Sequence, residues 1–255
     1  MKKQMKKRWL ALLMTIIVVL SSASMVLAAK SNGWEQRNGN WYYYENGVAV
    51  RNAWRLVDGE WYYFRSSGIM ATGWINLDTR YYLTSSGAMA TGWEKISGKW
   101  YYFESSGAVH KGWLLDGGKY YYLDENGVMV TGLRNVGGIM YGFADDGHMA
   151  TGWIELKATN APGGKAWYYF DSNGGMCTGW LDYGNQWYYL KSSGQMAVGW
   201  KKIYNGKEVY YEQDPATFYK APMYFFDGDG HMVTGSKTIN GKTYYFADDG
   251  HCTNF

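Results

Sequence analysis

Cysteine and proline are scarce in this chain of 255 residues, which holds two Cys and three Pro. Cys177 and Cys252 are separated by several copies of a repeat, too far for a disulfide, which needs Cα atoms within about 7 Å. The prolines, Pro162, Pro215 and Pro222, all lie in two enlarged segments. The chain is therefore not a disulfide scaffold, and packing of other side chains must hold its fold.

The chain also lacks an excess of basic over acidic residues beyond its first residues. The formal net charge is +3, from 25 basic and 22 acidic residues. Five of the basic residues lie within residues 2–8, which leaves 20 basic against 22 acidic residues and a net charge near −2. No basic face remains, so we expect neither nucleic acid nor an anionic membrane surface as a partner.

Long apolar runs occur only near the start of the chain. A basic segment is followed by an apolar run over residues 9–20, and Val26-Leu27-Ala28 supplies small residues before a cleavage point. This order is typical of a secretory signal peptide, which we place at residues 1–29. An uncleaved membrane anchor is the alternative. No later stretch is long and apolar enough to span a bilayer, so we expect a secreted protein on the cell surface.

Catalytic and metal-binding motifs are lacking. The sequence has no nucleophile elbow, Cys/His pair, P-loop or zinc helix, and its recurring carboxylates follow turns singly rather than in convergent pairs. His148, His231 and His251 occupy one position in three copies of the repeat, which indicates solvated turn residues. Asp227-Gly228-Asp229-Gly230 lacks the closing Glu of a calcium loop. We predict no enzyme activity, no metal and no cofactor.

A repeat of about 20 residues makes up most of the chain. Residues 54–74, WRLVDGEWYYFRSSGIMATGW, return as residues 93–113 and 180–200 with modest changes. Such periodicity indicates stacked supersecondary units, and no stretch remains for a separate domain within residues 30–255. Ten copies start near Trp34, Trp54, Trp74, Trp93, Trp113, Leu133, Trp153, Trp180, Trp200 and Ser236.

Each copy has the pattern of one β-hairpin. Asp58-Gly59 predicts a tight two-residue turn, and the aromatic run Trp61–Phe64 suits a strand. Alternation along that strand puts Trp61 and Tyr63 on one face and Tyr62 and Phe64 on the other. One hairpin is marginal alone, but stacked hairpins can share an aromatic core. The sequence therefore predicts an all-β fold of stacked hairpins.

Aromatic residues are unusually frequent, with 14 Trp and 25 Tyr. Rings can serve only as core, but several rings around a quaternary ammonium also form a cage, and flat rings stack on sugars. Two Trp about seven residues apart, flanking a turn in copy after copy, exceed what packing requires. The Met that follows each second turn, as at Met70, is expected to fill the core.

The pattern GW…xGxWYYF…GxMxTGW resembles the choline-binding, or cell-wall-binding, repeats of Gram-positive surface proteins. This resemblance implies a left-handed β-solenoid with choline groups of teichoic acid held between successive hairpins. It also implies a cage made by the Trp of GW, the Trp of WYYF and an aromatic residue of the next hairpin, often with a Met nearby.

Carried over copy by copy, the resemblance predicts about six working cages. The expected ligand-binding residues are Trp34, Trp41, Trp54, Trp61, Tyr63, Trp93, Trp100, Tyr102, Trp113, Tyr120, Trp153, Trp167, Tyr169, Trp180, Trp187 and Tyr189. Which Tyr of each WYY run closes the cage is left open.

Four copies depart from the pattern. Arg80 replaces the second Trp beside Trp74, and a guanidinium there could stack on the indole but would repel a cation. The copy at Leu133 has Met140 and Gly142 in aromatic positions. The remaining two copies pair Trp200 with Met223, unless Tyr210 or Tyr211 substitutes, and Ser236 with Thr243.

We predict a non-catalytic protein anchored to choline-bearing teichoic acid through several weak cages. A glucan- or oligosaccharide-binding module is the first alternative, because similar aromatic repeats occur in glucan-binding domains and in clostridial toxin repeats. An adhesin that contacts a host or partner protein through the enlarged loops near Asn160 and Asp214 is the second. Homodimerisation through terminal hairpins is left open.

Overall fold

The structure is a computed structural model that describes residues 32–255. The predicted signal peptide at residues 1–29 lies outside this range. Among the described residues, no helix has the length and apolar character needed to cross a membrane.

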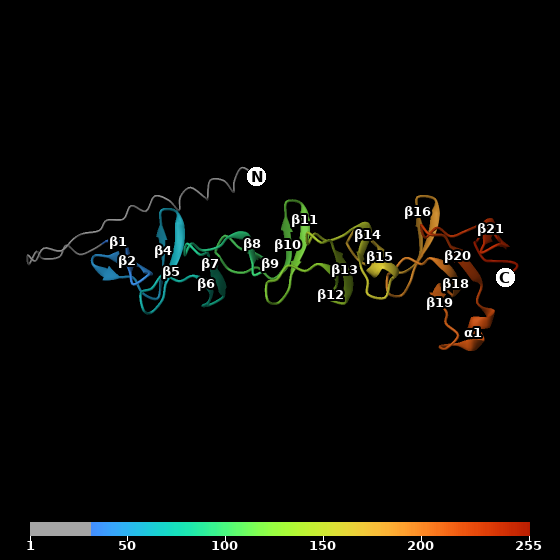
Figure 1. Cartoon of the computed structure of the whole chain (residues 1–255), viewed down its shortest axis with the longest axis horizontal. Helices are drawn as coiled ribbons and strands as arrows, with labels where there is room; N and C mark the ends of the chain where they lie inside the picture. The colour runs from blue at the N-terminus through green and yellow to red at the C-terminus, as the bar shows by residue number, and fades with distance from the viewer. Residues whose placement is uncertain (1–31) are drawn as a thin grey trace, which may run out of the picture. The chain divides into compact units, whose positions relative to one another are not determined.

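The described chain folds into ten antiparallel β-hairpins, so the predicted all-β architecture of stacked hairpins is confirmed (Figure 1). The paired strands are β1 (Gly33–Arg37) and β2 (Asn40–Glu45) with the short β3 (Val48–Ala49), β4 (Ala53–Val57) and β5 (Glu60–Phe64), β6 (Gly73–Asn76) and β7 (Arg80–Leu83), β8 (Gly92–Ile96) and β9 (Lys99–Phe103), β10 (Gly112–Asp116) and β11 (Lys119–Leu123), β12 (Gly132–Val136) and β13 (Ile139–Phe143), β14 (Gly152–Lys157) and β15 (Lys165–Phe170), β16 (Gly179–Tyr183) and β17 (Gln186–Leu190), β18 (Gly199–Tyr204) with β19 (Lys207–Glu208) and β20 (Met223–Phe226), and β21 (Gly235–Ile239) and β22 (Lys242–Phe246).

The hairpins form two compact units. One comprises residues 83–89 and the described residues up to 73, and the other comprises residues 74–82 and 90–255. The following contacts are each within one unit.

Turn chemistry sets the register of each hairpin. Asp58 and Gly59 both have positive φ, at 51° and 84°, as the predicted tight turn requires. The turn pairs Trp54 with Tyr63 across the strands. Because side chains alternate, Trp61 lies on the same face as this pair, and Phe64 lies on the other face.

The most deeply buried core residues are aromatic or leucine side chains at the ends of hairpin strands. Phe226 illustrates the packing: it is fully buried, and its ring lies 5.8 Å from that of Trp180 and 6.3 Å from that of Tyr189 in the preceding hairpin. Each hairpin therefore completes the core of its predecessor. The largest fully buried side chains are Phe64, Phe103, Phe143, Phe170, Phe226, Leu83, Leu123 and Leu190.

A backbone hydrogen bond joins successive hairpins. The N–H of Met232, after β20, donates to the carbonyl of Trp187 at 2.7 Å, so the later hairpin is tied to the first residue of the WYY run in the earlier one. The Met side chain also packs on the next turn, where a Cβ at Gly250 would overlap Met232 Sδ. Equivalent bonds run from Met70 to Trp41, Met89 to Trp61, Val109 to Arg80, Met129 to Trp100, Met149 to Tyr120, Met176 to Met140, Met196 to Trp167 and Cys252 to Met223.

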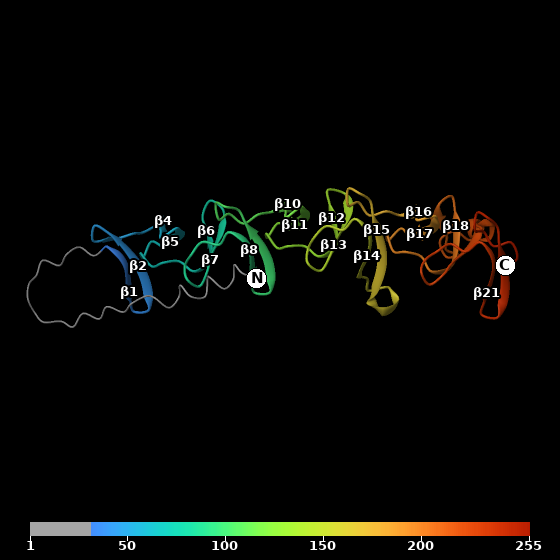
Figure 2. The same cartoon turned by 90° about the horizontal axis from the view of Figure 1, so that it is seen from above.

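The two enlarged copies carry additional structure between their paired strands. A 3₁₀ turn (Pro162–Gly164) closes the longer β14–β15 hairpin, coloured yellow in Figure 2. The other enlargement carries the helix α1 (Pro215–Lys220), which the sequence analysis left as a loop. Asp214 caps this helix, since its carboxylate accepts a bond from the N–H of Thr217.

Gly142 shows how one copy compensates for a missing aromatic residue. It occupies β13 where other copies have Tyr, and an added Cβ would overlap the ring of the buried Phe170 in the next hairpin. The neighbouring ring takes the volume that the absent side chain leaves.

We therefore expect Gly142→Ala to destabilise the protein by about 1–3 kcal/mol, because Phe170 cannot move without disturbing the core. Gly228→Ala is the control, since nothing lies within 4 Å of a Cβ there and its φ is ordinary. Thermal unfolding followed by near-ultraviolet circular dichroism measures the difference. Equal midpoints for the two variants would contradict this account of the core.

Candidate aromatic binding slots

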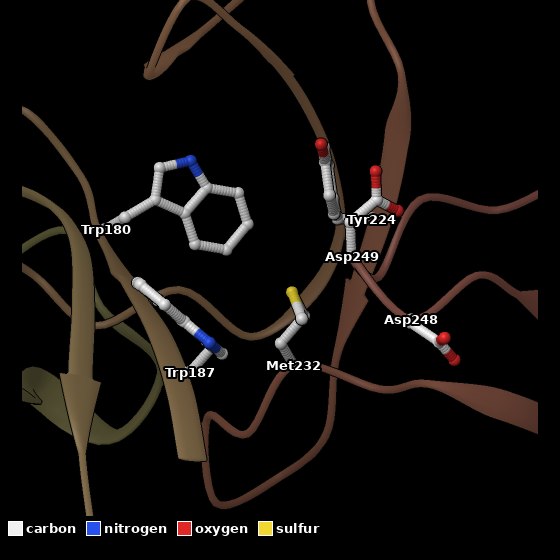
Figure 3. Close-up of a pocket in the computed structure, with 6 residues that line it drawn as sticks. All are labelled: Trp180, Trp187, Tyr224, Met232, Asp248 and Asp249. Atoms are coloured by element: carbon white, nitrogen blue, oxygen red, sulfur yellow. The ribbon is translucent and has the colours of Figure 1, made fainter. Parts of the chain in front are cut away.

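A cavity of about 400 Å³ opens between hairpins in the larger unit (Figure 3). It is lined by Trp180, Trp187, Tyr224, Met232, Asp248 and Asp249. Figure 3 shows the two indoles on one side, the Tyr224 ring opposite them and the Met232 sulfur between. Three hairpins therefore contribute to one cavity.

The strands hold these rings at right angles. Trp180 lies on β16 and Trp187 on β17, with ring centroids 6.3 Å apart and planes at 84°. Tyr224, on β20 of the next hairpin, lies 5.0 Å from Trp180 at 70°. Trp187 remains 45% exposed, so the rings form an open box and not a sealed core.

The chemistry of the box is that of a cation site. Ring faces carry negative electrostatic potential, and several faces around one cation act together. Burial raises the pKa of Tyr224, and the charge of Asp249 adds to this shift, so the phenol stays neutral at physiological pH. The box therefore offers neutral, electron-rich walls to a compact apolar cation.

Three other hairpins present the same arrangement, which we call an aromatic slot: two rings of one hairpin at right angles and a Tyr of the next. The ring pairs are Trp34 and Trp41 (6.2 Å, 88°) with Tyr62 at 4.8 Å from Trp34, Trp93 and Trp100 (6.4 Å, 86°) with Tyr121 at 5.0 Å from Trp93, and Trp113 and Tyr120 (6.4 Å, 87°) with Tyr141 at 4.8 Å from Trp113.

In the two remaining predicted pairs, the first Trp packs on tyrosine rings. Trp153 contacts Tyr188 of the next hairpin at 4.9 Å, but Tyr183 also lies against it at 6.3 Å. Trp54 packs on Tyr63 at 5.2 Å, while Trp61 is 43% exposed. Trp167 is likewise exposed. Their assignment as ligand-binding residues stays a prediction.

The tyrosines named as site residues lie outside the slots. Tyr63, Tyr102, Tyr169 and Tyr189 each pack at 5.2–5.3 Å on the first Trp of their own hairpin, because the register pairs them across the strands. Tyr189 is only 2% exposed, and its hydroxyl donates to the carbonyl of Gly206 at 3.2 Å. These four residues support the slot from behind.

The closing ring is instead the second residue of each WYY run, which the sequence analysis left open. It lies on the face shared with the buried Phe, and therefore points towards the preceding hairpin. That alternation was visible in the sequence and is the signal that could have found it. The residues are Tyr62, Tyr121, Tyr141, Tyr188 and Tyr224.

Two copies lack one or both of the paired rings. The guanidinium of Arg80 lies 3.7 Å from the ring centroid of Trp74, and its Nη1 donates to the carbonyl of Asn126 at 3.4 Å. An intramolecular cation thus covers the indole that a ligand would use. Leu133 and Met140 replace both rings in the other copy.

Phe255 supplies an aromatic neighbour that the sequence analysis missed. Its ring lies 4.9 Å from that of Trp200 and stacks on that of Tyr244 at 6.1 Å. Tyr211 instead contacts Phe218 and Tyr219 of helix α1. Phe255 therefore joins Phe225, Tyr244 and Phe246 as an aromatic neighbour of Trp200.

The histidines of the turns pair with neighbouring carboxylates. His148 contacts Asp146 and His251 contacts Asp249. In a third copy, Asp227, Asp229 and His231 each place one potential ligand atom within 4.8 Å of the others. Turn hydrogen bonds account for this cluster, because Asp227 Oδ1 accepts from the N–H groups of Asp229 and His231.

The hairpins define a repeat protein with aromatic slots between successive hairpins. The family model of the choline-binding repeat matches residues 50–91, 90–131 and 163–199, and that of a putative cell wall binding repeat matches residues 237–252. A search of curated proteins found no match.

Solved structures of choline-binding proteins are similar to the chain. The choline-binding domain of CbpL from Streptococcus pneumoniae is 31% identical, with a TM-score of 0.52 over 82% of this chain and 99% of that one. CbpJ from Streptococcus pneumoniae TIGR4 is 29% identical, with a TM-score of 0.52 over 87% and 94%. The modular autolysin LytC from Streptococcus pneumoniae is 25% identical, with a TM-score of 0.57 over 87% of this chain and 46% of that one.

The chain therefore belongs to the family of choline-binding, cell-wall-binding repeat proteins. Repeats of this class bind choline and the cell wall, which makes the protein a binding protein of the cell surface.

The filled slot at Trp74 gives a test of the geometry. We expect Arg80→Trp to add one bound choline per chain, because it removes the covering cation and supplies the missing second wall. Met140→Trp is the control: its partner is Leu133, so no second ring completes a box. Equilibrium dialysis at saturating choline counts the sites. An unchanged count for Arg80→Trp, or a gain for Met140→Trp, would contradict the two-ring requirement.

Proposed function

We propose that the protein anchors itself to choline-bearing teichoic acid of the bacterial envelope and has no catalytic activity of its own. Residues 1–29 would direct its export and then be removed. The observation that carries the proposal is the open box of Trp180, Trp187 and Tyr224, with Trp187 exposed to solvent.

The box suits a trimethylammonium group. Its methyl groups are apolar and spread the positive charge, so the group gains from ring faces without needing hydrogen-bond donors. A desolvated cation over aromatic rings gains about 2 kcal/mol, and an exposed one less than half of that. A single slot therefore binds weakly. Its two rings at right angles present two faces to one compact cation.

Repetition turns weak slots into firm attachment. Four slots with three rings each lie in the described chain, at Trp34, Trp93, Trp113 and Trp180. A polymer that carries many choline groups can occupy several slots at once, and each further contact is intramolecular. Effective concentration can then raise the avidity by factors of about 10² to 10⁴ over one slot.

The solved relatives support a binding role. The match to CbpJ covers 87% of this chain and 94% of that one. The match to LytC instead covers less than half of that modular autolysin, so the same kind of repeat occurs within a longer protein there. Hairpin repeats account for residues 33–246 of this chain, and we assign no catalytic role to them.

Chromatography on a quaternary-ammonium resin tests the proposal. The protein should be retained in salt that abolishes simple ion exchange, and free choline should release it. A triple variant, Trp41→Ala with Trp100→Ala and Trp187→Ala, should pass through, because it removes one wall from each of three slots.

Tyr219→Ala is the matched control, since Tyr219 is an aromatic residue 72% exposed on helix α1 and contributes to no slot. This variant should behave as the native protein does. Retention that choline cannot reverse, or release by an oligosaccharide alone, would refute choline recognition and favour a glycan-binding module.

A further inference from the structure

The slot at Trp93 has a carboxylate at the edge of its first ring. Asp116, the last residue of β10, belongs to the following hairpin, and its Oδ2 accepts a hydrogen bond from the indole Nε1 of Trp93 at 3.0 Å. Leu114, which pairs with Tyr121 across the strands, precedes Asp116 by two residues, so Asp116 lies on the face of the closing ring. Asp116 and Tyr121 therefore both reach the indole of Trp93 from the same side of one hairpin.

The position of Asp116 holds an aliphatic side chain in the other three slots. The corresponding residues of the following hairpins are Val57, Val136 and Ile203. Ile203 is buried, and Trp180 packs against the core cluster to which it belongs. None of these aliphatic side chains can accept a hydrogen bond from an indole. Among the four slots of the described chain, the carboxylate is therefore specific to the slot at Trp93.

The same slot has a cation over its second ring. Lys95 pairs with Trp100 across β8 and β9, and its Nζ lies 5.7 Å from the ring centroid of Trp100. An ammonium there weakens the attraction of the slot for a positively charged ligand. The residues opposite the second ring in the other three slots are Gln36, Leu115 and Asp182, and none of them is basic. The slot with a lysine at one position is thus the slot with a carboxylate at the other.

The charge of Asp116 is not balanced by a neighbouring cation. Lys119, which pairs with Asp116 across the strands, instead approaches Asp146 at 3.6 Å. Within residues 32–255, the indole N–H of Trp93 is the only hydrogen-bond partner of the Asp116 side chain, and no ion pair engages it. Asp116 is half-buried, so its charge is screened less than that of an exposed carboxylate.

A carboxylate bound to an indole N–H favours a cation in two ways. The hydrogen bond polarises the ring and makes its face a better partner for positive charge. The carboxylate also attracts the cation directly, because the Debye length at physiological ionic strength is about 8 Å and the two groups lie on the same indole. A neutral ligand of the same shape gains from neither effect.

Resting on the choline recognition proposed above, we propose that Asp116 is a positioning residue that sets the preference of the Trp93 slot for a cation. It fixes the edge of the indole and offsets the positive charge of Lys95. The slot therefore holds a quaternary ammonium group in preference to a neutral group of equal size, although a lysine lies over one of its walls.

The test compares choline with its carbon isostere dimethylbutanol, in which a carbon atom replaces the nitrogen and no charge remains. Uniform ¹⁵N labelling makes each indole N–H visible by NMR, and Trp→Phe variants assign the signals of Trp93, Trp100 and Trp187. The Trp100 signal reports ligand binding at this slot, and the Trp93 signal reports the hydrogen bond. Trp187 reports a slot in which Ile203 takes the place of Asp116.

Two substitutions of Asp116 separate charge from packing. Asp116→Val installs the aliphatic residue type of other slots, and it should weaken choline binding at Trp100 about three-fold without changing the binding of the isostere. Asp116→Asn keeps an acceptor for the indole. It should lose a similar share of the choline affinity while the Trp93 signal keeps its hydrogen-bonded position. Neither substitution should alter the affinities reported by Trp187.

A compensating variant tests the role of Lys95. Asp116→Val combined with Lys95→Leu removes both charges and gives both positions an aliphatic side chain. It should recover the choline affinity that Asp116→Val alone loses. Glu212→Gln is the matched control, because it removes an exposed carboxylate from the segment before helix α1, which contributes to no slot.

The outcomes separate the two proposals. Weaker choline binding at Trp100 in both Asp116 variants, with the isostere unaffected, supports the inference. Equal weakening of both ligands, native affinity in Asp116→Asn, or no recovery with Lys95→Leu overturns it while choline recognition stands. If choline perturbs Trp187 but not Trp100, the slot at Trp93 is no site and the inference fails. If choline perturbs neither indole, the proposed function itself fails.

Discussion

A backbone hydrogen bond between successive hairpins is the contact on which the structure depends. Its donor is the N–H of the residue that corresponds to Met232, and its acceptor is the carbonyl of the residue that corresponds to Trp187 in the preceding hairpin. A single hairpin of this length cannot bury its own Phe, so it needs a neighbour. The bond from Met232 to Trp187 sets where that neighbour lies, and Phe226 then fills the space under Trp180 and Tyr189. Every slot is a consequence of the same joint.

The joint builds core and binding surface from alternate residues of one strand. In β20, Phe226 is buried, while Tyr224 two residues earlier reaches the preceding hairpin and closes its slot. The first ring of each WYY run lies on the opposite face of its strand from the buried last residue. That ring can therefore change without removing the core residue. Arg80 uses this freedom: it covers Trp74 while Leu83 of the same strand stays fully buried.

The walls of the slots can therefore differ between copies of the repeat while the stacking of the hairpins stays the same. One holds an internal guanidinium, one is next to Phe255, one has neither ring, and one has two carboxylates in its lining. A chain of such joints is a set of related sites on a common frame.

The sequence by itself determined the all-β class, the hairpin count, the tight turns and the paired rings, because period, Gly-containing turns and strand alternation are local properties. Arg80 and Leu133 could be excluded as slot residues for the same reason. Only the tertiary structure decided that Tyr62 and its equivalents close the slots while Tyr63 and its equivalents support them, since that depends on which face meets the neighbour. Helix α1, the ring of Phe255 and the carboxylates beside Tyr224 likewise depended on contacts between segments distant in sequence, which no local pattern encodes.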